Sequence, residues 1–249
     1  MEIKEIRKTL KKSGIKSGDT LMLHGDAGIA AEINSTKKNK LKIFFDEIIK
    51  YLGKNGTLLV PTFTYSSCHN EIFNIKKTPS NLGLFSENFR KRKNVRRTSH
   101  PIFSFSIYGK KYKYFEKAKI ETCFGKNSIF ELFRKVNGKI LCAGCSFNRI
   151  TFIHYAEEIF GVKYRFFKNF VGLVRSNKQS CLVKTEYFVR KLNCRSRLNL
   201  KYFYQYLLKR GNVFSVNFGR YSIHTVEANV LLNNCLKVLK KNKNFLVKK

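Results

Sequence analysis

Three short apolar runs, each followed by a polar loop, constrain most strongly what this chain can fold into. They occupy residues 20–24, 56–61 and 139–143. Each is too short for a buried helix and too uniformly apolar for a strand with one face in water, so we predict strands buried on both faces. Apolar residues at helical spacing predict helices over 2–13, 39–53, 86–92, 130–135, 151–160 and 225–240, and 103–108 alternates like a strand.

Helices that alternate with buried strands predict an α/β fold. We expect a three-layer sandwich in which a mixed central sheet carries helices on both faces, and aromatic-rich stretches in the C-terminal third add antiparallel strands. No repeat and no Pro/Gly/Ser-rich linker divides the 249 residues, so a single domain over 1–249 is expected.

Composition excludes several classes of protein. The hydrophobic fraction of 43% is close to the globular average and excludes an intrinsically disordered polycation. No stretch reaches the roughly 18 apolar residues of a membrane span. The first residues, MEIKEIRKTLKK, lack the apolar centre of a secretory signal, so we expect a cytoplasmic protein.

The net charge of +34 points to an anionic partner, because Lys and Arg number 50 against 16 Asp and Glu. Residues 159–249 hold 20 basic side chains and only Glu186 and Glu227 as acids. Compositional drift in a chain rich in Lys, Asn, Ile and Phe predicts the same excess. No dedicated nucleic-acid motif accompanies the charge, but 164–170 interleaves basic and aromatic residues as single-strand binders do. A non-enzymatic nucleic-acid-binding protein therefore remains an alternative.

The seven cysteines are odd in number and follow no export signal, which predicts reduced thiols. Cys142 and Cys145 have the spacing of a metal or redox pair. A second pair at metal-ligand spacing is missing and Cys142 ends an apolar run, so we expect a small buried side chain and no metal site.

The segment 144–158 carries the strongest indication of chemistry. A strand ends at Cys142, a polar loop follows and a helix begins, which is where open α/β sheets bind ligands. With Thr151 as N-cap, His154 falls in the first turn, where the helix dipole disfavours the imidazolium. Glu157 follows three residues later on the same face and is expected to hold one ring nitrogen. A neutral, oriented histidine suits a general base, whereas a helix-start histidine above a surface glutamate is the alternative.

Residues 150–158, ITFIHYAEE, resemble the T-x-x-H-Y-A-E signature of the aminoglycoside 3-N-acetyltransferase family. Further blocks resemble the family in the same order: 19–24 and 56–64 its first two strands and loops, 78–90 its TPS-x-x-G-L-x-S-E-x-F-R block, 96–104 its R-S-x-H-P-x-x-S block, and 124–128 a glycine–serine turn with Ile129 in place of the usual proline. The resemblance covers about residues 5–165. Residues 166–249, where family members commonly bind the acceptor, match poorly.

The resemblance implies a coenzyme A-dependent N-acyltransferase that uses acetyl-CoA or another acyl-CoA as co-substrate. It makes His154 the base and Glu157 its orienting partner. On the acyl-CoA side it implies His24, Gly25, Asp26, Ala27, Arg96, Arg97, Ser99, Ser104 and Asn148. On the acceptor side it implies Thr62, Thr64, His69, His100, Thr151 and Glu227. Solvated side chains are the alternative for Arg96 and Arg97, and structural support is the alternative for His100.

The charge favours an anionic acceptor over a polycationic antibiotic. Two acids in the C-terminal third are few for binding several ammonium groups, and a strongly basic protein repels a cation at long range. We therefore expect an amino sugar, nucleotide-linked and used for a surface glycan, with acetylation of an aminoglycoside antibiotic as the alternative. The sequence leaves the oligomeric state open, a homodimer included.

Overall fold

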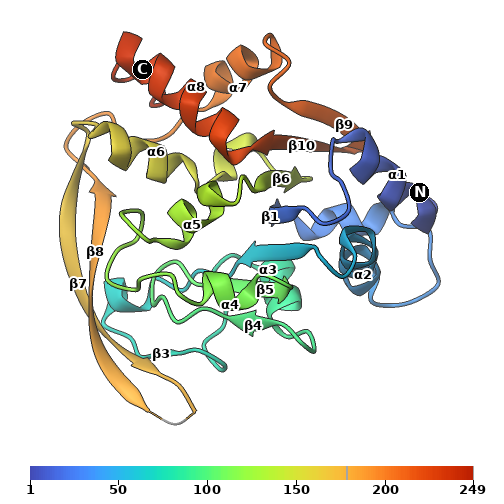
Figure 1. The fold of residues 1–249 in the computed structure, drawn as a ribbon, viewed down its shortest axis with the longest axis horizontal. Coiled ribbons are helices and arrows are strands. Elements are labelled where there is room, and N and C mark those ends of the chain that lie inside the picture. The colour runs from blue at the N-terminus through green and yellow to red at the C-terminus, as the bar shows by residue number, and fades with distance from the viewer. Residues whose placement is uncertain (178, 249) are drawn as a thin grey trace.

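A seven-stranded mixed sheet forms the centre of the computed structural model, which describes residues 1–177 and 179–248 (Figure 1). The three apolar runs become the parallel strands β1 (Thr20–Gly25), β2 (Thr57–Pro61) and β6 (Lys139–Ala143), with β1 between the other two. Antiparallel strands extend the sheet on both sides: β5 (Phe105–Gly109) and β4 (Arg96–Arg97) beyond β2, and β10 (Tyr221–Glu227) and β9 (Phe214–Phe218) beyond β6.

Helices cover both faces of this sheet because alternate residues of the buried strands point to opposite sides. Leu21, Leu23 and Leu58 share one apolar core with the helices α1 (Ile3–Lys12), α2 (Lys40–Leu52) and α3 (Leu84–Arg90). Met22, Leu59 and Ile140 share the other core with α5 (Ile129–Lys135), α6 (Ile153–Phe160) and α8 (Ala228–Lys241). The predicted three-layer α/β sandwich is confirmed.

A second sheet lies beside α6. Its main part is a hairpin of two 11-residue strands, β7 (Arg165–Arg175) and β8 (Ser180–Arg190), paired from Arg165 opposite Arg190 to Arg175 opposite Ser180. Figure 1 shows the hairpin along one side of the molecule, with β3 (Phe73–Asn74) near its turn. The hairpin therefore forms a wall next to the helix that carries His154.

Short elements complete the fold. They are α4 (Tyr112–Phe115), α7 (Lys201–Leu208) and the 3₁₀ helices η1 (Ala27–Glu32), η2 (Ser66–His69) and η3 (Phe147–Arg149). Among the described residues, no helix has both the length and the apolarity needed to cross a bilayer.

Three predicted helix starts were wrong. The helix predicted from 86 begins at Leu84, directly after Gly83. The N-cap position of α6 is occupied by Phe152 and not Thr151, since η3 and a turn precede the helix, and His154 is its second residue. The helix predicted from 225 begins at Ala228 because Thr225 and Glu227 still pair with β6 as the end of β10.

Candidate active site

The first turn of α6 places His154 against Glu157. The His154 Nδ1 atom lies 2.7 Å from Glu157 Oε2. The glutamate side chain is fully buried, whereas the histidine side chain retains 18% exposure. The contact predicted from the three-residue spacing is therefore present, with one side of the imidazole reachable from solvent.

Two residues at the start of the hairpin complete this cluster. Tyr164 Oη donates a hydrogen bond of 2.8 Å to Glu157 Oε1, and Arg165 Nε lies 2.7 Å from Oε2. The Arg165 guanidinium also places Nη2 2.9 Å from His154 Nδ1 and donates from Nη1 to the Phe188 carbonyl at 3.0 Å. Neither Tyr164 nor Arg165 is among the site residues predicted from the sequence. The interleaved basic and aromatic residues of 164–170 were the available signal, but they do not show which cation turns toward α6.

Burial and charge keep this histidine neutral and this glutamate ionised. Burial lowers the pKa of His154, the Arg165 charge lowers it further, and Glu157 offsets part of the effect. Burial alone would raise the pKa of Glu157. Hydrogen bonds with His154 and Tyr164 and the charge of Arg165 outweigh that effect and hold the carboxylate's pKa below its usual range. In the tautomer that donates Nδ1–H to Glu157, His154 Nε2 has a free lone pair.

Two clefts border the segment 148–154, and the larger of them is lined by His154. Its volume is about 900 Å³, and it lies between α6, the β7–β8 hairpin and the loop that follows β8. Aromatic rings of Phe166, Phe170 and Tyr187 line it. Five basic side chains also line it: Arg165, Lys168, Arg190, Lys191 and Arg197. No carboxylate occurs among its described lining residues, so the cleft next to the imidazole is strongly basic.

A smaller cleft of about 260 Å³ lies at the carboxyl ends of β1, β2 and β6. Four residues of the predicted acyl-CoA set line it, together with Thr151 from the predicted acceptor set: His24, Gly25, Asp26 and Asn148. The segment 148–154 borders both clefts, since Asn148 and Thr151 line the smaller one and His154 the larger.

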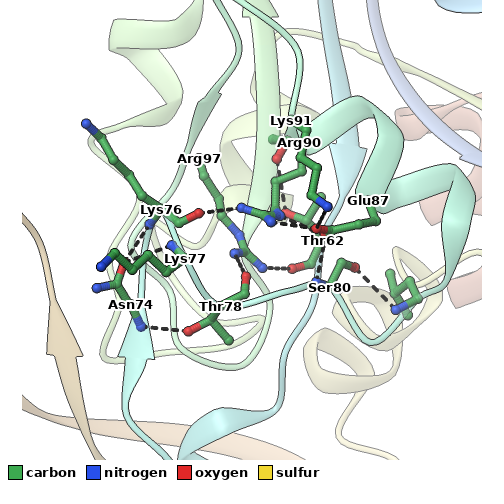
Figure 2. A network of polar contacts seen from close by, with 12 residues as sticks. Thr62, Asn74, Lys76, Lys77, Thr78, Ser80, Glu87, Arg90, Lys91 and Arg97 are labelled. Atoms are coloured by element: carbon green, nitrogen blue, oxygen red, sulfur yellow. Dashed lines mark hydrogen bonds and ion pairs between the residues drawn. The ribbon is translucent and has the colours of Figure 1, made fainter. Parts of the chain in front are cut away.

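Arg97 does not line either cleft. Figure 2 shows its guanidinium enclosed by main-chain carbonyls: Nη2 donates to Thr62 and Nη1 to Thr78, each at 2.5 Å. Its Nε donates to Ser104 Oγ at 3.0 Å, and its charge lies 4.9 Å from the centre of the Phe73 ring. Burial lowers the pKa of Arg97 to about 9. We therefore reassign Arg97, Ser104 and Thr62 from ligand binding to bracing the loop that follows β2.

Thr64 and His100, two more residues predicted to contact the acceptor, make hydrogen bonds within the fold. Thr64 Oγ1 donates to the Pro101 carbonyl at 2.8 Å. His100 is buried; its Nδ1 accepts from the amides of Ile102 and Phe103, and its Nε2 lies 3.2 Å from the Thr122 carbonyl. Both ring nitrogens are occupied, which supports the structural alternative for His100.

The remaining predicted residues line neither cleft. Arg96 is exposed on β4, 4.9 Å from the Tyr112 ring, and Ser99 lines a separate narrow recess. His69 is exposed at the end of η2, and Ala27 begins η1 without lining the cleft that Asp26 borders. Glu227 pairs with Lys139, at the opposite end of β6 from the smaller cleft.

The fold is a three-layer α/β sandwich with a cleft at the carboxyl ends of its parallel strands, the place where open α/β sheets bind ligands. The family model described as aminoglycoside 3-N-acetyltransferase matches residues 32–240. The chain belongs to this family, which confirms the resemblance carried by the sequence blocks.

Curated relatives are distant. An aminoglycoside N(3)-acetyltransferase III of Salmonella sp and one of Acinetobacter baumannii are each 23% identical over 175 residues. The match covers 63% of this chain, and the chain spans about 60% of the length of these relatives.

Solved structures share the fold over nearly the whole chain. A structure titled AAC-VIa bound to Sisomicin has a TM-score of 0.83 at 18% identity and covers 97% of this chain and 98% of its own. One titled AAC-IIIb binary with CoASH has a TM-score of 0.82 at 17% identity, with 97% coverage of both chains.

Proposed function

We propose that this chain is an acyl-CoA-dependent N-acyltransferase in which His154 accepts the proton of the acceptor amine. The observation that carries the proposal is an imidazole whose Nδ1 atom lies 2.7 Å from a fully buried carboxylate and whose ring borders a cleft. Acyl transfer to nitrogen needs such a base, because only an unprotonated amine attacks a thioester. The amine nitrogen bonds to the acyl carbon, the carbon–sulfur bond breaks, and the amine proton moves to His154 Nε2.

The neighbours of His154 have separate roles in this mechanism. Glu157 selects the tautomer with Nδ1–H and stabilises the imidazolium as it forms. Tyr164 and Arg165 hold the carboxylate in place, and the Arg165 charge limits how basic the ring becomes. A histidine with a lowered pKa is unprotonated at neutral pH and ready to accept a proton.

We place the acyl donor in the smaller cleft at the strand ends and the acceptor in the larger cleft. The segment 148–154 borders both, so a thioester and an amine would meet next to His154. A relative whose structure is titled binary with CoASH supports coenzyme A as the carrier. Acetyl-CoA is the donor that the family description implies.

The acceptor we propose is an amine that also carries negative charge, such as a nucleotide-linked amino sugar of surface-glycan synthesis. Five cations and no carboxylate line the cleft next to His154 in the described chain, and a polycation would meet repulsion there. Acetylation of an aminoglycoside is the second candidate, favoured by the names of the relatives and by structures whose titles name sisomicin and a gentamicin.

Release of free coenzyme A from acetyl-CoA tests the base. Replacing His154 with alanine is expected to lower turnover by about 10²-fold or more. Calorimetric binding of acetyl-CoA and the melting temperature should stay close to those of the unmodified protein. Near-normal turnover in His154→Ala would remove the assignment.

The identity of the acceptor is tested with a panel of amines and with variants in which a cationic side chain is replaced by an acidic one. We expect turnover on nucleotide-linked amino sugars, and Arg197→Glu should raise their KM by about tenfold because it reverses a cation lining the cleft. Arg195→Glu is the matched control, since Arg195 is exposed on the same loop and does not line the cleft. Rapid turnover of sisomicin with none on nucleotide-linked amino sugars would establish the second candidate instead.

A further inference from the structure

A third cavity, of about 190 Å³, lies where β6 begins and β10 ends, at the opposite end of these strands from the smaller cleft. Roughly 10–15 Å³ of such space holds one water molecule, so this cavity has room for a ligand of several heavy atoms. The strand ends, the turn after α1, the loop before β9 and the first turn of α8 enclose it. It shares no described lining residue with the two clefts near His154.

A buried hydroxyl group lines this cavity. Thr225 of β10 is only 2% exposed, and its Oγ1 atom makes no hydrogen bond within the described chain. Buried hydroxyl groups in proteins are nearly always hydrogen-bonded, because water would otherwise solvate them better. A ligand with a polar group in the cavity supplies the missing partner. Thr225 therefore indicates a polar ligand and not a purely apolar one.

Two opposite charges lie side by side on the same wall. Lys139 of β6 and Glu227 of β10 are register partners, so their side chains leave the same face of the sheet. Lys139 Nζ donates to the Gly14 carbonyl and to Asp19 Oδ2, each at 2.8 Å, which leaves its third N–H free. The Glu227 side chain forms no ion pair within the described chain and accepts one hydrogen bond, of 3.4 Å, from Asn137. The wall therefore offers a free N–H donor beside a carboxylate whose charge is not compensated.

Apolar side chains line the remainder of the cavity. Val226 and Val230 contribute aliphatic surface, and Phe214 contributes an aromatic ring. That ring lies directly over Gly14, since a Cβ atom on the glycine would be 2.8 Å from it. Phe214 is nevertheless 54% exposed. A ligand in the cavity can therefore cover apolar area that now faces water.

We propose that this cavity binds a free α-amino acid with a short apolar side chain. The ammonium group lies at Glu227, the carboxylate at the free N–H of Lys139 and the hydroxyl of Thr225, and the side chain against the two valines and Phe214. An amino acid carries adjacent opposite charges, as the wall does. A simple amine leaves the Lys139 donor and its charge unmatched, and a simple carboxylate is repelled by Glu227. The binding does not depend on acyl transfer.

Isothermal titration calorimetry of the full chain tests the site. L-alanine, L-valine and L-leucine are titrated separately, and we expect at least one of them to bind with one molecule per chain. The tightest binder is then compared with the amine that lacks its carboxylate and the acid that lacks its ammonium group, which for L-valine are isobutylamine and 3-methylbutanoate. Each analogue should bind at least tenfold more weakly, because each loses hydrogen bonds between charged groups. Absence of binding by all three amino acids, or equal binding by either analogue, overturns the proposal.

Two substitutions of Thr225 locate the ligand. Thr225→Val keeps the shape of the side chain but removes the hydroxyl, so affinity should fall about tenfold while the melting temperature stays the same or rises. Thr225→Ser keeps the hydroxyl and should retain most of the affinity. Unchanged affinity in Thr225→Val would show that the amino acid binds elsewhere and would overturn the assignment.

A charge substitution tests the ammonium contact. Glu227→Gln should weaken binding by about tenfold or more, because it removes the carboxylate charge opposite the ammonium group. Glu2→Gln is the matched control, since Glu2 is exposed before α1 and does not line the cavity. Equal losses in the two variants would contradict the Glu227 contact. These heats of binding do not depend on turnover, so a chain that binds the amino acid but transfers no acyl group contradicts only the proposed function.

Discussion

At the scale of single residues, Glu157 should set the pH dependence of activity. A base works in its neutral form, so the rate should rise with pH through the pKa of His154 and then level off. Glu157 raises that pKa, opposing burial and Arg165. Glu157→Gln should therefore move the acidic limb to lower pH, and the plateau should fall by roughly 10²-fold because the ring loses its orienting acceptor. The kcat/KM profile between pH 5 and 9 measures both effects.

Glu158→Gln is the control for this profile. Glu158 is the next residue of α6, and none of its hydrogen bonds or ion pairs in the described structure involves His154. Burial, followed by the nearby charge of Glu186, raises its own pKa to about 7. An acidic limb that shifts equally in both glutamine variants would show that Glu157 has no specific influence on the base.

The hydrogen bonds of Arg97 predict that this side chain stabilises the fold. Its guanidinium binds the carbonyls of Thr62 and Thr78 in a buried setting, and these acceptors lose their partner in Arg97→Ala. We expect the free energy of unfolding in urea to fall by about 3 kcal/mol. Arg96→Ala, the exposed neighbour, should change it by less than about 0.5 kcal/mol. A larger effect from Arg96 than from Arg97 would contradict this division of roles.

At the scale of elements, the packing of β7 against η2 depends on Gly172. A Cβ atom placed there would lie 2.1 Å from Ser67 Oγ and 3.1 Å from Ser67 Cα, too close for either to remain in place. Gly172→Ala should therefore lower the free energy of unfolding by about 1–3 kcal/mol through overpacking. Val171→Ala, an exposed neighbour on β7, is the control and should cost much less. Equal losses in urea denaturation would show that the close approach is not limiting.

The sheet and the helices could be predicted where the signal is local. β1, β2 and β6 were found because strands buried on both faces need continuous apolar runs, and α2 because its apolar spacing ends at Gly53. The β7–β8 hairpin was foreseen only as aromatic-rich extended stretches. Exposed Phe167 and Leu182 break its alternation, and its register is set by pairing between strands.

In the candidate site, too, contacts between residues close in sequence could be predicted and contacts between distant segments could not. The contact between His154 and Glu157 follows from helix geometry over three residues and was predictable. Tyr164 and Arg165 reach Glu157 only because the chain leaves α6 through Gly161 and returns as β7. The sequence shows that Arg97 is a cation but not that it is buried. A ligand contact was therefore expected, whereas in the fold Arg97 holds the loop after β2 in place.

At the scale of the whole molecule, the charge is concentrated where it can act on a ligand. The C-terminal part from 159 holds only two acids, and it supplies all five cations of the larger cleft. These cations come from β7, from the end of β8 and from the loop after it, three segments that the hairpin fold brings to one cavity. The two acids of this part of the chain, Glu186 and Glu227, are not among the described lining residues, so no lining carboxylate offsets the five cations.

Added salt should therefore change the KM of anionic acceptors and the KM of polycationic acceptors in opposite directions. Between about 0.1 M and 1 M sodium chloride the screening length falls from about 10 Å to about 3 Å, which removes most long-range attraction to the cleft. The KM of a nucleotide-linked amino sugar should rise severalfold over this range, whereas that of a polycationic amine should fall and that of a singly charged amine should change little. Arg197→Glu should flatten the dependence for the anionic acceptor, and Arg195→Glu should leave its slope nearly unchanged. A KM for the anionic acceptor that does not vary with salt would mean that the cations of this cleft do not select the substrate.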